Sequence, residues 1–451
     1  MADTRYYNPA LETLARADLD SLVDERIRAT VRYAEEHSPF YRRWFARHNI
    51  RPEAIREHED LRELPVISGA TIRRYQPPQA EEFCFKSVPW EAVFTVNETS
   101  GTSGVPKAFF LTWEDWERYA GKYARMFVSQ GFLPGDRMVV CASYGMNVGA
   151  NTMTLAARDL GVTVIPEGKC TFPVRVMAHY RPTAVIGSVF KLLRLARRME
   201  AEGIPPAEAG VARLVIGGES FAPESRRYLE EVWGCPVYNT YGSTEGTMCG
   251  ECTRQAGLHV PEDLVHFDLY DPRMDRFVQD GETGRLVYTT LLEPGKRAGT
   301  LLLNYDTEDT CRVVSRERCG CGRTHMRIDN PRREAETVLV AGVPLNRVDV
   351  EAAVFAPGNM AFLNGEYEAF IYGGDEAGET VLRVSMESLD PAGADPGEVE
   401  ETFLSTLFRL VPALAAAYEG GTLQFVCNVT PPGGLELHRA PGRPKRIVDR
   451  R

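Results

Sequence analysis

Short apolar runs alternate with amphipathic segments through the middle of this chain, and that alternation constrains the fold more than any other feature. The runs resemble buried strands, and the segments between them carry apolar residues at helical spacing. Strands are expected at 137–142, 162–166, 184–187, 213–216 and 237–239, and helices at 151–160, 174–180, 189–202 and 223–232. Elements that alternate in this way form a largely parallel sheet covered by helices. The sequence therefore predicts an α/β fold.

The rest of the chain divides into regions of different pattern. A chain of 451 residues is too long for one hydrophobic core, so several domains are expected. Residues 1–84 predict a helical N-terminal subdomain, and 85–332 the large core with its mixed and parallel sheets. Within that core, about 246–330 is expected to be a β-rich, metal-bearing subdomain. Residues 333–451 predict a small, mobile α+β domain. Its strands are expected near 366–373, 380–386 and 422–428, and its helix at 397–418.

The composition excludes several classes of partner. The net charge of −11 argues against non-specific binding to nucleic acid or to an anionic membrane. No apolar run approaches the roughly 18–20 residues that span a bilayer. The first residues lack the basic-then-apolar pattern of a signal peptide. We therefore expect a cytoplasmic protein whose ten cysteines are reduced thiols or metal ligands.

One loop has the composition of a phosphate-binding site. Residues 99–107 read Thr-Ser-Gly-Thr-Ser-Gly-Val-Pro-Lys and lie between two strand-like segments, 92–96 and 108–112. Glycines and hydroxyl side chains in such a loop can surround phosphate oxygens with donors, and Lys107 adds a positive charge. The pattern differs from the Walker loop, in which Gly-x-x-x-x-Gly-Lys-Ser/Thr opens a helix. The sequence thus predicts a phosphate-binding loop within a hairpin.

Two further polar segments follow strands of the predicted sheet. Strand 213–216 runs into Gly217-Gly218-Glu219, and strand 237–239 runs into Tyr241-Gly242-Ser243-Thr244-Glu245. Ligands of such sheets bind at the carboxyl ends of the strands, so both segments are candidates for the same site. The carboxylate of Glu245 would repel a phosphate unless a cation lay between them. A Mg²⁺ ion held by Glu245 resolves that conflict.

These three segments, in this order and at these separations, resemble the motifs of one group of enzymes. The chain resembles the adenylate-forming superfamily of acyl-CoA ligases and, within it, the phenylacetate-CoA ligase family, as a divergent member. Further segments that are similar to that family lie at 33–43, 257–259, 319–324 and 445–451. The resemblance extends over nearly the whole chain.

The resemblance implies a two-step reaction. A substrate carboxylate attacks the α-phosphorus of ATP to give an acyl adenylate and pyrophosphate, and an acceptor, usually the thiol of coenzyme A, then takes the acyl group. Such chemistry depends mainly on positioning and on charge neutralisation. The resemblance also implies a homodimer.

The resemblance assigns roles to individual residues. Thr244 is expected to contact the α-phosphate, Tyr241 to lie against the adenine, and Asp309 to bind the ribose. The catalytic set is Thr244, Glu245, Arg443 and Lys445. The ATP site is Thr99, Ser100, Gly101, Thr102, Ser103, Gly104, Lys107, Gly217, Gly218, Glu219, Asn239, Tyr241, Gly242, Ser243, Thr244, Asp309 and Arg333.

The chain departs from the family pattern at three places. Asn304 and Asp306 stand where the family usually has arginines, which inverts the local charge. The hinge between the domains reads Arg-Arg-Glu-Ala-Glu at 332–336, so Arg333 keeps a ribose or hinge role while the acids are shifted. The tail has Arg443 where the family's catalytic lysine is expected, and Lys445 follows two residues later. Either residue fills the role, or adenylation is slow or altered, or the basic tail extends into solvent.

A second group of residues predicts a metal site. Cys319 and Cys321 are too close in sequence for an easy disulfide, but two such thiolates suit one Zn²⁺ ion. Cys252 and His259 complete a tetrahedral structural site, and Cys249 competes with His259 as the fourth ligand. The alternative is a set of buried free thiols.

The acid is expected to bind between strand ends. The candidate residues are Tyr144, Gly145, Met146, Asn147, Ser188, Phe190 and Ile216. An aromatic wall of Tyr144 and Phe190 favours a flat aromatic acid such as a substituted benzoate, an anthranilate, a hydroxybenzoate or an arylacetate. The alternative is that these aromatic residues belong to the core. Two other functions stay open: transfer of the acyl group to a carrier protein, an amine or a hydroxyl, and nucleotide binding without catalysis.

Overall fold

The chain forms two compact units in the computed structural model, which describes residues 5–99, 105–168, 173–374, 378–390, 395–439 and 445–451. The first unit comprises Met1–Gly187, Gly210–Glu219 and Tyr238–Pro331, and the second comprises Ser188–Ala209, Ser220–Val237 and Arg332–Arg451. The last segment of the second unit begins beside the predicted boundary at 333. That unit also takes in two helices, α8 (Val189–Ala201) and α9 (Pro223–Trp233), which the sequence places in the large core. None of the described helices is long and apolar enough to cross a bilayer.

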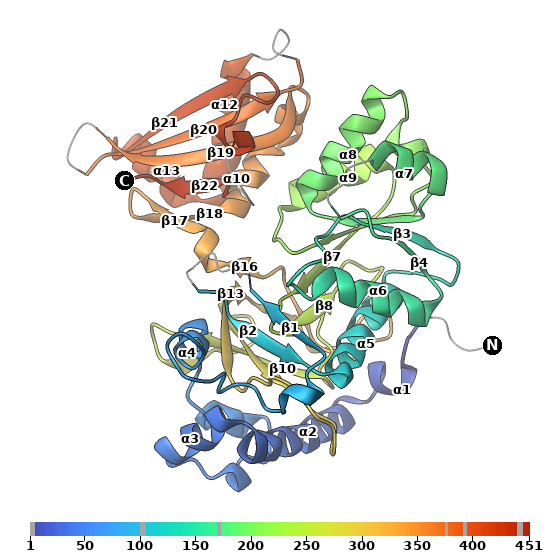
Figure 1. Ribbon diagram of the computed structural model, residues 1–451. Helices are drawn as coiled ribbons and strands as arrows, with labels where there is room; N and C mark the ends of the chain where they lie inside the picture. The colour runs from blue at the N-terminus through green and yellow to red at the C-terminus, as the bar shows by residue number, and fades with distance from the viewer. Residues whose placement is uncertain (1–4, 100–104, 169–172, 375–377, 391–394, 440–444) are drawn as a thin grey trace. The chain divides into compact units, whose positions relative to one another are not determined.

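The first unit contains a nine-stranded sheet in the order β14-β15-β9-β8-β7-β6-β5-β3-β4. Figure 1 labels β3, β4, β7 and β8 of this sheet. β3 runs parallel to β4 and to β5, and β5 runs parallel to β6. From β7 to β14, each strand is antiparallel to its neighbour. The strands are β3 (Arg137–Val140), β4 (Thr163–Ile165), β5 (Ala184–Gly187), β6 (Arg213–Gly217), β7 (Val237–Gly242), β8 (Met248–Gly250), β9 (Leu258–His259), β14 (Val313–Ser315) and β15 (Arg327–Ile328). The predicted α/β fold is confirmed, with an antiparallel extension at one edge.

Three helices of this unit connect or cover the parallel strands: α5 (Trp113–Ser129), α6 (Gly149–Leu160) and α7 (Pro173–Tyr180). α5 begins with a capping box in which Thr112 and Asp115 each bind the other's backbone N–H. α5 and α6 share a buried cluster with the sheet, in which Phe127 and Ala156 lie among Met138 and Ile186. This burial fixes α5, which reaches the candidate site described below.

The N-terminal helices share a core with a second, antiparallel sheet. That sheet includes β10 (Val265–Asp271), β11 (Arg276–Phe277), β12 (Gly284–Thr290) and β13 (Tyr305–Cys311), in the order β11-β10-β12-β13. The helices are α1 (Pro9–Glu12), α2 (Arg16–His37), α3 (Pro39–Arg47), η1 (Pro52–Ala54), η2 (Glu59–Glu63) and α4 (Gly69–Arg74). One buried cluster joins Leu19 and Phe40 of the helices to Phe267 and Tyr288 of the sheet. Residues 1–84 therefore have no separate core of their own.

The second unit contains a four-stranded sheet in the order β21-β20-β19-β22. Its strands are β19 (Leu363–Gly373), β20 (Thr380–Ser388), β21 (Leu423–Thr430) and β22 (Ile447–Asp449), beside a hairpin of β17 (Thr337–Val340) and β18 (Val343–Asn346). Its other elements are η4 (Pro206–Glu208), β16 (Arg332–Arg333), η5 (Glu334–Glu336), α10 (Arg347–Val354), α11 (Pro357–Met360), α12 (Pro396–Leu410), α13 (Pro412–Glu419) and η6 (Glu436–Arg439). The predicted single helix at 397–418 is wrong, because Pro412 disfavours helical backbone at Val411 and opens a new helix.

Asn304, one of the departures from the family pattern, has a structural role. Its side-chain amide donates hydrogen bonds to the carbonyl oxygens of Leu61 and Leu64, 3.1 Å away for Leu64, and thereby closes the end of η2. Its backbone has a φ of 46°, a conformation that Asn tolerates better than most residues. The side chain is buried, and the Leu61 carbonyl also accepts the Leu64 N–H over 3.0 Å, so the Leu64 carbonyl depends more on Asn304.

Replacing Asn304 by alanine tests this role. We expect Asn304→Ala to lower the free energy of unfolding by about 2–4 kcal/mol, because it removes two buried hydrogen bonds and places alanine at a strained, positive φ. Asn49→Ala is the matched control, since Asn49 also has a positive φ of 54° but is exposed. It should cost about 1 kcal/mol from the backbone alone. Urea denaturation followed by fluorescence measures both, and equal losses would contradict the interpretation.

Candidate active site

The predicted phosphate loop connects the two strands of a hairpin, β1 (Thr95–Glu98) and β2 (Ala108–Leu111). Its ends bind each other: the Thr99 N–H donates to the Lys107 carbonyl, and the Lys107 N–H donates to the Thr99 hydroxyl, each over 3.1 Å. Ser100, Gly101, Thr102, Ser103 and Gly104 lie outside the described residues. The side chain of Gln76 binds both Pro106 and Ala108, so it holds the hairpin from the N-terminal region.

Lys107, Glu245 and Tyr305 meet beside this hairpin. The Lys107 ammonium lies 2.6 Å from a carboxylate oxygen of Glu245 and 2.5 Å from the Tyr305 hydroxyl, which also donates to Glu245 over 3.2 Å. Both charged side chains are nearly buried, at 13% and 9% exposure. Burial alone would raise the pKa of Glu245, but the charge and hydrogen bond of Lys107 outweigh it and lower that pKa. Glu245 is therefore held as a carboxylate.

This trio has the chemistry to bind a metal–polyphosphate. Mg²⁺ prefers oxygen ligands such as the carboxylate of Glu245, and the ammonium of Lys107 can donate hydrogen bonds to a phosphate oxygen. The same two groups neutralise each other in this structure. A ligand that brings both a cation and an anion can replace that ion pair without leaving either charge buried and unpaired.

The turn that carries Glu245 is tightly ordered. The Ser243 N–H donates to the Thr247 carbonyl, and the Gly246 N–H donates to the Ser243 carbonyl, each over 3.1 Å. Thr244 lies half-buried in this turn. A Cβ at Gly242 would lie 2.5 Å from the terminal methyl of Met248, so a larger residue there requires that side chain to move.

The candidate nucleoside residues also lie together. The Tyr241 hydroxyl on β7 donates to the Asp309 carboxylate on β13 over 2.7 Å. Burial and then the charge of Asp309 raise the pKa of Tyr241. Since β13 carries both Tyr305 and Asp309, one strand reaches both the candidate metal ligand and the candidate ribose ligand.

The segment after β6 packs closely on β7. A Cβ at Gly217 would lie 2.6 Å from the Thr240 hydroxyl, which donates to the Ile216 carbonyl. Gly218 has a φ of 80° and leads into Glu219. Asn239 is buried in β7, where its N–H donates to the Glu251 carboxylate over 2.7 Å. These positions agree with a site at the strand ends, and the individual contacts with ATP stay predictions.

The departure at Asp306 is neutralised locally. Its carboxylate pairs with Arg285 over 3.0 Å and accepts the Glu308 N–H. The inverted charge expected from Asn304 and Asp306 therefore does not face the candidate site unpaired. Sequence reasoning missed Arg285, Gln76 and the role of Tyr305, because their partners are distant in the sequence.

The candidate acid-binding residues fall in both units. In the first, Tyr144, Gly145, Met146 and Asn147 form an exposed loop after β3, and its Met146 carbonyl accepts the Asn97 side chain and the Glu98 N–H. Ile216 is fully buried in β6.

In the second unit, Ser188 caps α8, and Phe190 is buried under the Arg446 guanidinium, whose carbon lies 3.3 Å from the ring centre. Grouping these residues into one acid pocket stays a prediction.

The basic tail has one firmly held residue. Arg446 is buried, pairs with Glu366 over 2.7 Å and donates to the Tyr367 carbonyl over 2.8 Å. Lys445, directly before it, is exposed, and Arg443 lies outside the described residues. Arg333 is exposed on β16. The roles of Lys445, Arg443 and Arg333 stay predictions.

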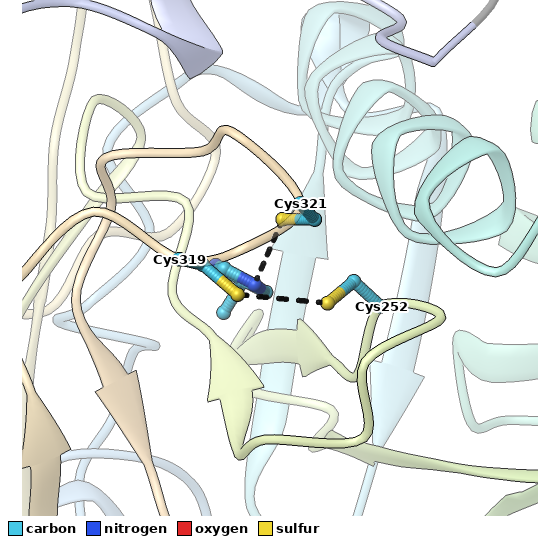
Figure 2. Close-up of side chains that lie close together, drawn as sticks. Cys252, Cys319 and Cys321 are labelled. Carbon is cyan, nitrogen blue, oxygen red and sulfur yellow. Dashed lines mark hydrogen bonds between the residues drawn. The ribbon is translucent and has the colours of Figure 1, made fainter.

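Cys252, His259, Cys319 and Cys321 form a compact cluster in the first unit. Figure 2 labels its three cysteines. Their ligand atoms all lie within 4.8 Å of one another. The sulfurs of Cys252 and Cys319 are 3.9 Å apart, and Cys321 lies 3.6 Å from Nε2 of His259. The hydrogen bond between Cys252 and Cys321 lowers the pKa of Cys321 and raises the pKa of Cys252. Cys249 is buried in a hydrophobic cluster and is not part of the set.

The segment that carries Cys319 and Cys321 also binds the N-terminal region. The Tyr6 hydroxyl donates to the Cys321 carbonyl over 3.1 Å, and Arg323 pairs with Glu12 over 2.7 Å. A ring nitrogen of His325 lies 3.0 Å from the Leu11 carbonyl oxygen. These contacts join the segment that carries Cys319 and Cys321 to the residues around α1.

Comparison with known proteins identifies the family. The model of the AMP-binding enzyme family matches residues 35–290, which include the phosphate loop, the segment after β6 and the Glu245 turn. The chain belongs to the AMP-binding enzyme family. The predictions of an adenylate-forming fold and of an AMP-forming acid–CoA ligase are thereby confirmed at the level of the family.

Individual relatives extend this match over most of the chain. A phenylacetate-coenzyme A ligase of Thermus thermophilus is 30% identical over 357 residues, or 78% of each chain. The phenylacetate-coenzyme A ligase of Escherichia coli is 27% identical over 73% of this chain and 74% of its own. A crystal structure of 2-hydroxyisobutyryl-CoA ligase with 2-HIB-AMP, in the postadenylation state, has a TM-score of 0.83 at 25% identity. That match covers 100% of this chain and 94% of the other.

The Tyr305 hydroxyl is expected to contribute to nucleotide use. Tyr305→Phe removes its contacts with Lys107 and Glu245 but keeps the ring. Hydrogen bonds to charged groups contribute about 1.5–3 kcal/mol, so kcat/KM for Mg·ATP should fall about 10–100-fold in ATP–pyrophosphate exchange. Tyr288→Phe is the control, because Tyr288 is equally buried and its hydroxyl contacts Thr290. It should change the rate by less than about twofold, and an unchanged rate for Tyr305→Phe would contradict the assignment.

Proposed function

We propose that this protein activates an aromatic carboxylic acid with ATP and transfers the acyl group to coenzyme A. The observation that carries the proposal is the buried cluster of Lys107, Glu245 and Tyr305 at the end of the phosphate loop. The names of the relatives support the reaction: two act on phenylacetate and one on 2-hydroxyisobutyrate, all with coenzyme A. The aromatic acid rests on the first two and on the exposed Tyr144.

The residues of the first unit suit the adenylation half-reaction. Lys107 would bind and orient a phosphate, and Glu245 would hold Mg²⁺. That ion, when bound, neutralises charge on the polyphosphate. Tyr241 and Asp309 would fix the nucleoside, so that the α-phosphorus stands at a set distance from the acid. Lys445 or Arg443 would add the cation between the carboxylate and the α-phosphate.

A panel of acids in ATP–pyrophosphate exchange tests the proposal. Phenylacetate, substituted benzoates and 2-hydroxyisobutyrate should be compared, and we expect exchange with an aromatic acid. Adding coenzyme A should then give a thioester, detected by mass spectrometry. Exchange without a thioester would favour another acceptor, and exchange with 2-hydroxyisobutyrate alone would overturn the aromatic assignment.

A matched pair of lysine variants keeps the test specific. Lys107→Met should lower the exchange rate by at least about 100-fold, because it removes a preorganised charge from a buried site. Lys296→Met removes an exposed lysine of the same unit and should leave the rate unchanged. No exchange by the wild-type protein with any acid would favour nucleotide binding without catalysis.

We also propose that the cluster of Cys252, His259, Cys319 and Cys321 holds a structural Zn²⁺ ion. Three sulfurs and one imidazole nitrogen are a ligand set that zinc prefers, and four protein ligands leave no open position for catalysis. The ion would join β9 to the segment that holds residues 5–13.

Zinc content and proteolysis test this site together. The purified protein should contain about one equivalent of zinc, and Cys319→Ala should lose it. Chelation should speed proteolytic cleavage between residues 5 and 13, because the segment that binds them is no longer fixed. Cys249→Ala is the control and should keep its zinc. Loss of zinc from Cys249→Ala, or a wild-type protein without zinc, would contradict the assignment.

A further inference from the structure

The backbone of the Glu245 turn is held by one face of α5. The Lys122 ammonium donates to the Gly246 carbonyl over 2.8 Å, and the Tyr119 hydroxyl lies 3.5 Å from the Glu245 carbonyl. Tyr119 and Lys122 are three residues apart on the helix, so they share a face. Two consecutive carbonyls beside the candidate metal ligand are therefore contacted from the same helix.

Burying the Lys122 side chain at this position carries a large desolvation cost. It is 3% exposed, and burial followed by the charge of Arg118 lowers its pKa well below the ordinary value. The nearby carboxylates already form ion pairs with arginines: Asp115 pairs with Arg118, and Asp263 pairs with Arg125. Within the described part of the chain, no carboxylate lies at ion-pair distance from Lys122. An apolar side chain would fill this space at a lower desolvation cost, so packing alone does not account for an amine.

The turn packs against α5 without spare room. Gly246 has a φ of 101°, and a Cβ there would lie 2.3 Å from the Tyr119 hydroxyl. The Glu245 side chain projects from this turn to Lys107 and Tyr305. The carboxylate and the backbone of Glu245 are thus held by separate groups: Lys107 and Tyr305 hold the first, and α5 holds the second.

We propose that Lys122 is a positioning residue for metal-nucleotide binding, which fixes the Glu245 turn while the carboxylate exchanges Lys107 for a divalent cation. The inference rests on the proposed role of Glu245 as a magnesium ligand. When the cation displaces Lys107, the Glu245 carboxylate loses one of its two side-chain partners and keeps Tyr305. The hydrogen bond from Lys122 to Gly246 does not depend on that ion pair, so it keeps the carboxylate in place.

Calorimetric titration of the full chain with ATP, with and without Mg²⁺, tests the inference. Lys122→Met keeps the length of the side chain but cannot donate. We expect its Kd for Mg·ATP to rise about tenfold, while its Kd for ATP in the presence of EDTA changes less than about twofold. A merely structural role would weaken both or neither. Lys122→Gln, a shorter donor, should lie between Lys122→Met and the wild type.

Two controls separate the possible failures. Met126→Leu alters the same helix and the same small cavity, of about 30 Å³, and should bind Mg·ATP as the wild type does. The same Kd for Mg·ATP in Lys122→Met and the wild type would overturn the inference. A wild-type protein that does not bind Mg·ATP would overturn the proposed function as well. If Lys122→Met does not fold, the same titration of Lys122→Gln decides, and a wild-type Kd there overturns the inference.

Discussion

The ion pair between Lys107 and Glu245 connects the phosphate-loop hairpin to the mixed sheet of the first unit. Its two residues are 138 positions apart in the chain and are both nearly buried. Removing two charges from water costs more than their attraction returns unless hydrogen bonds complete the site, and Tyr305 supplies one to the carboxylate. The proposed role of the pair in binding Mg·ATP would account for keeping two charges buried at this cost. Its groups stay desolvated and oriented before any ligand arrives.

Several surrounding contacts follow from that arrangement. The hairpin has to stay in place for Lys107 to reach Glu245, and Gln76 binds its backbone on both sides of Lys107. The turn has to stay in place for Glu245 to point at Lys107, and Lys122 binds the next carbonyl. Each anchor comes from a different element, so no single local segment could build the site.

Features that depend on local pattern could be predicted from the sequence. The alternating strands and helices between 137 and 239 were expected because apolar spacing reports directly on secondary structure. The loop at 99–107 was expected because glycine, hydroxyl and lysine side chains gather within nine residues. Tyr305, Gln76 and Lys122 could not be predicted, because their roles arise from partners brought close only by the fold. The sequence predicts a single helix at 397–418, although Pro412 is a sequence signal for the end of one helix and the start of the next.

The cluster of three cysteines and one histidine also shows what spacing in the sequence can and cannot predict. The spacing of Cys319 and Cys321 predicts a pair of ligands, but spacing alone cannot choose between Cys249 and His259. The pairing of β8 with β9 explains the choice of ligand. Gly250 of β8 pairs with His259 of β9, and neighbouring residues on a strand point to opposite faces, so Cys249 points away from the face that carries His259. Cys249 is buried in the hydrophobic cluster that contains Leu258 and Val260.

The contact between the N-terminal region and the segment after Cys321 also bears on synthesis at the ribosome. Thr324 donates its N–H to the Glu12 carbonyl, and these partners are separated by 312 residues. At ordinary translation rates, roughly 15–60 s pass between the appearance of one partner and the other. During that interval α1 lacks the contact with Thr324, and until β10 to β13 (265–311) are made the apolar face of α2 lacks the antiparallel sheet on which it packs. The nascent chain therefore exposes hydrophobic helices for longer than a protein whose first helices pack on their sequence neighbours, and chaperones that bind such segments have time to act.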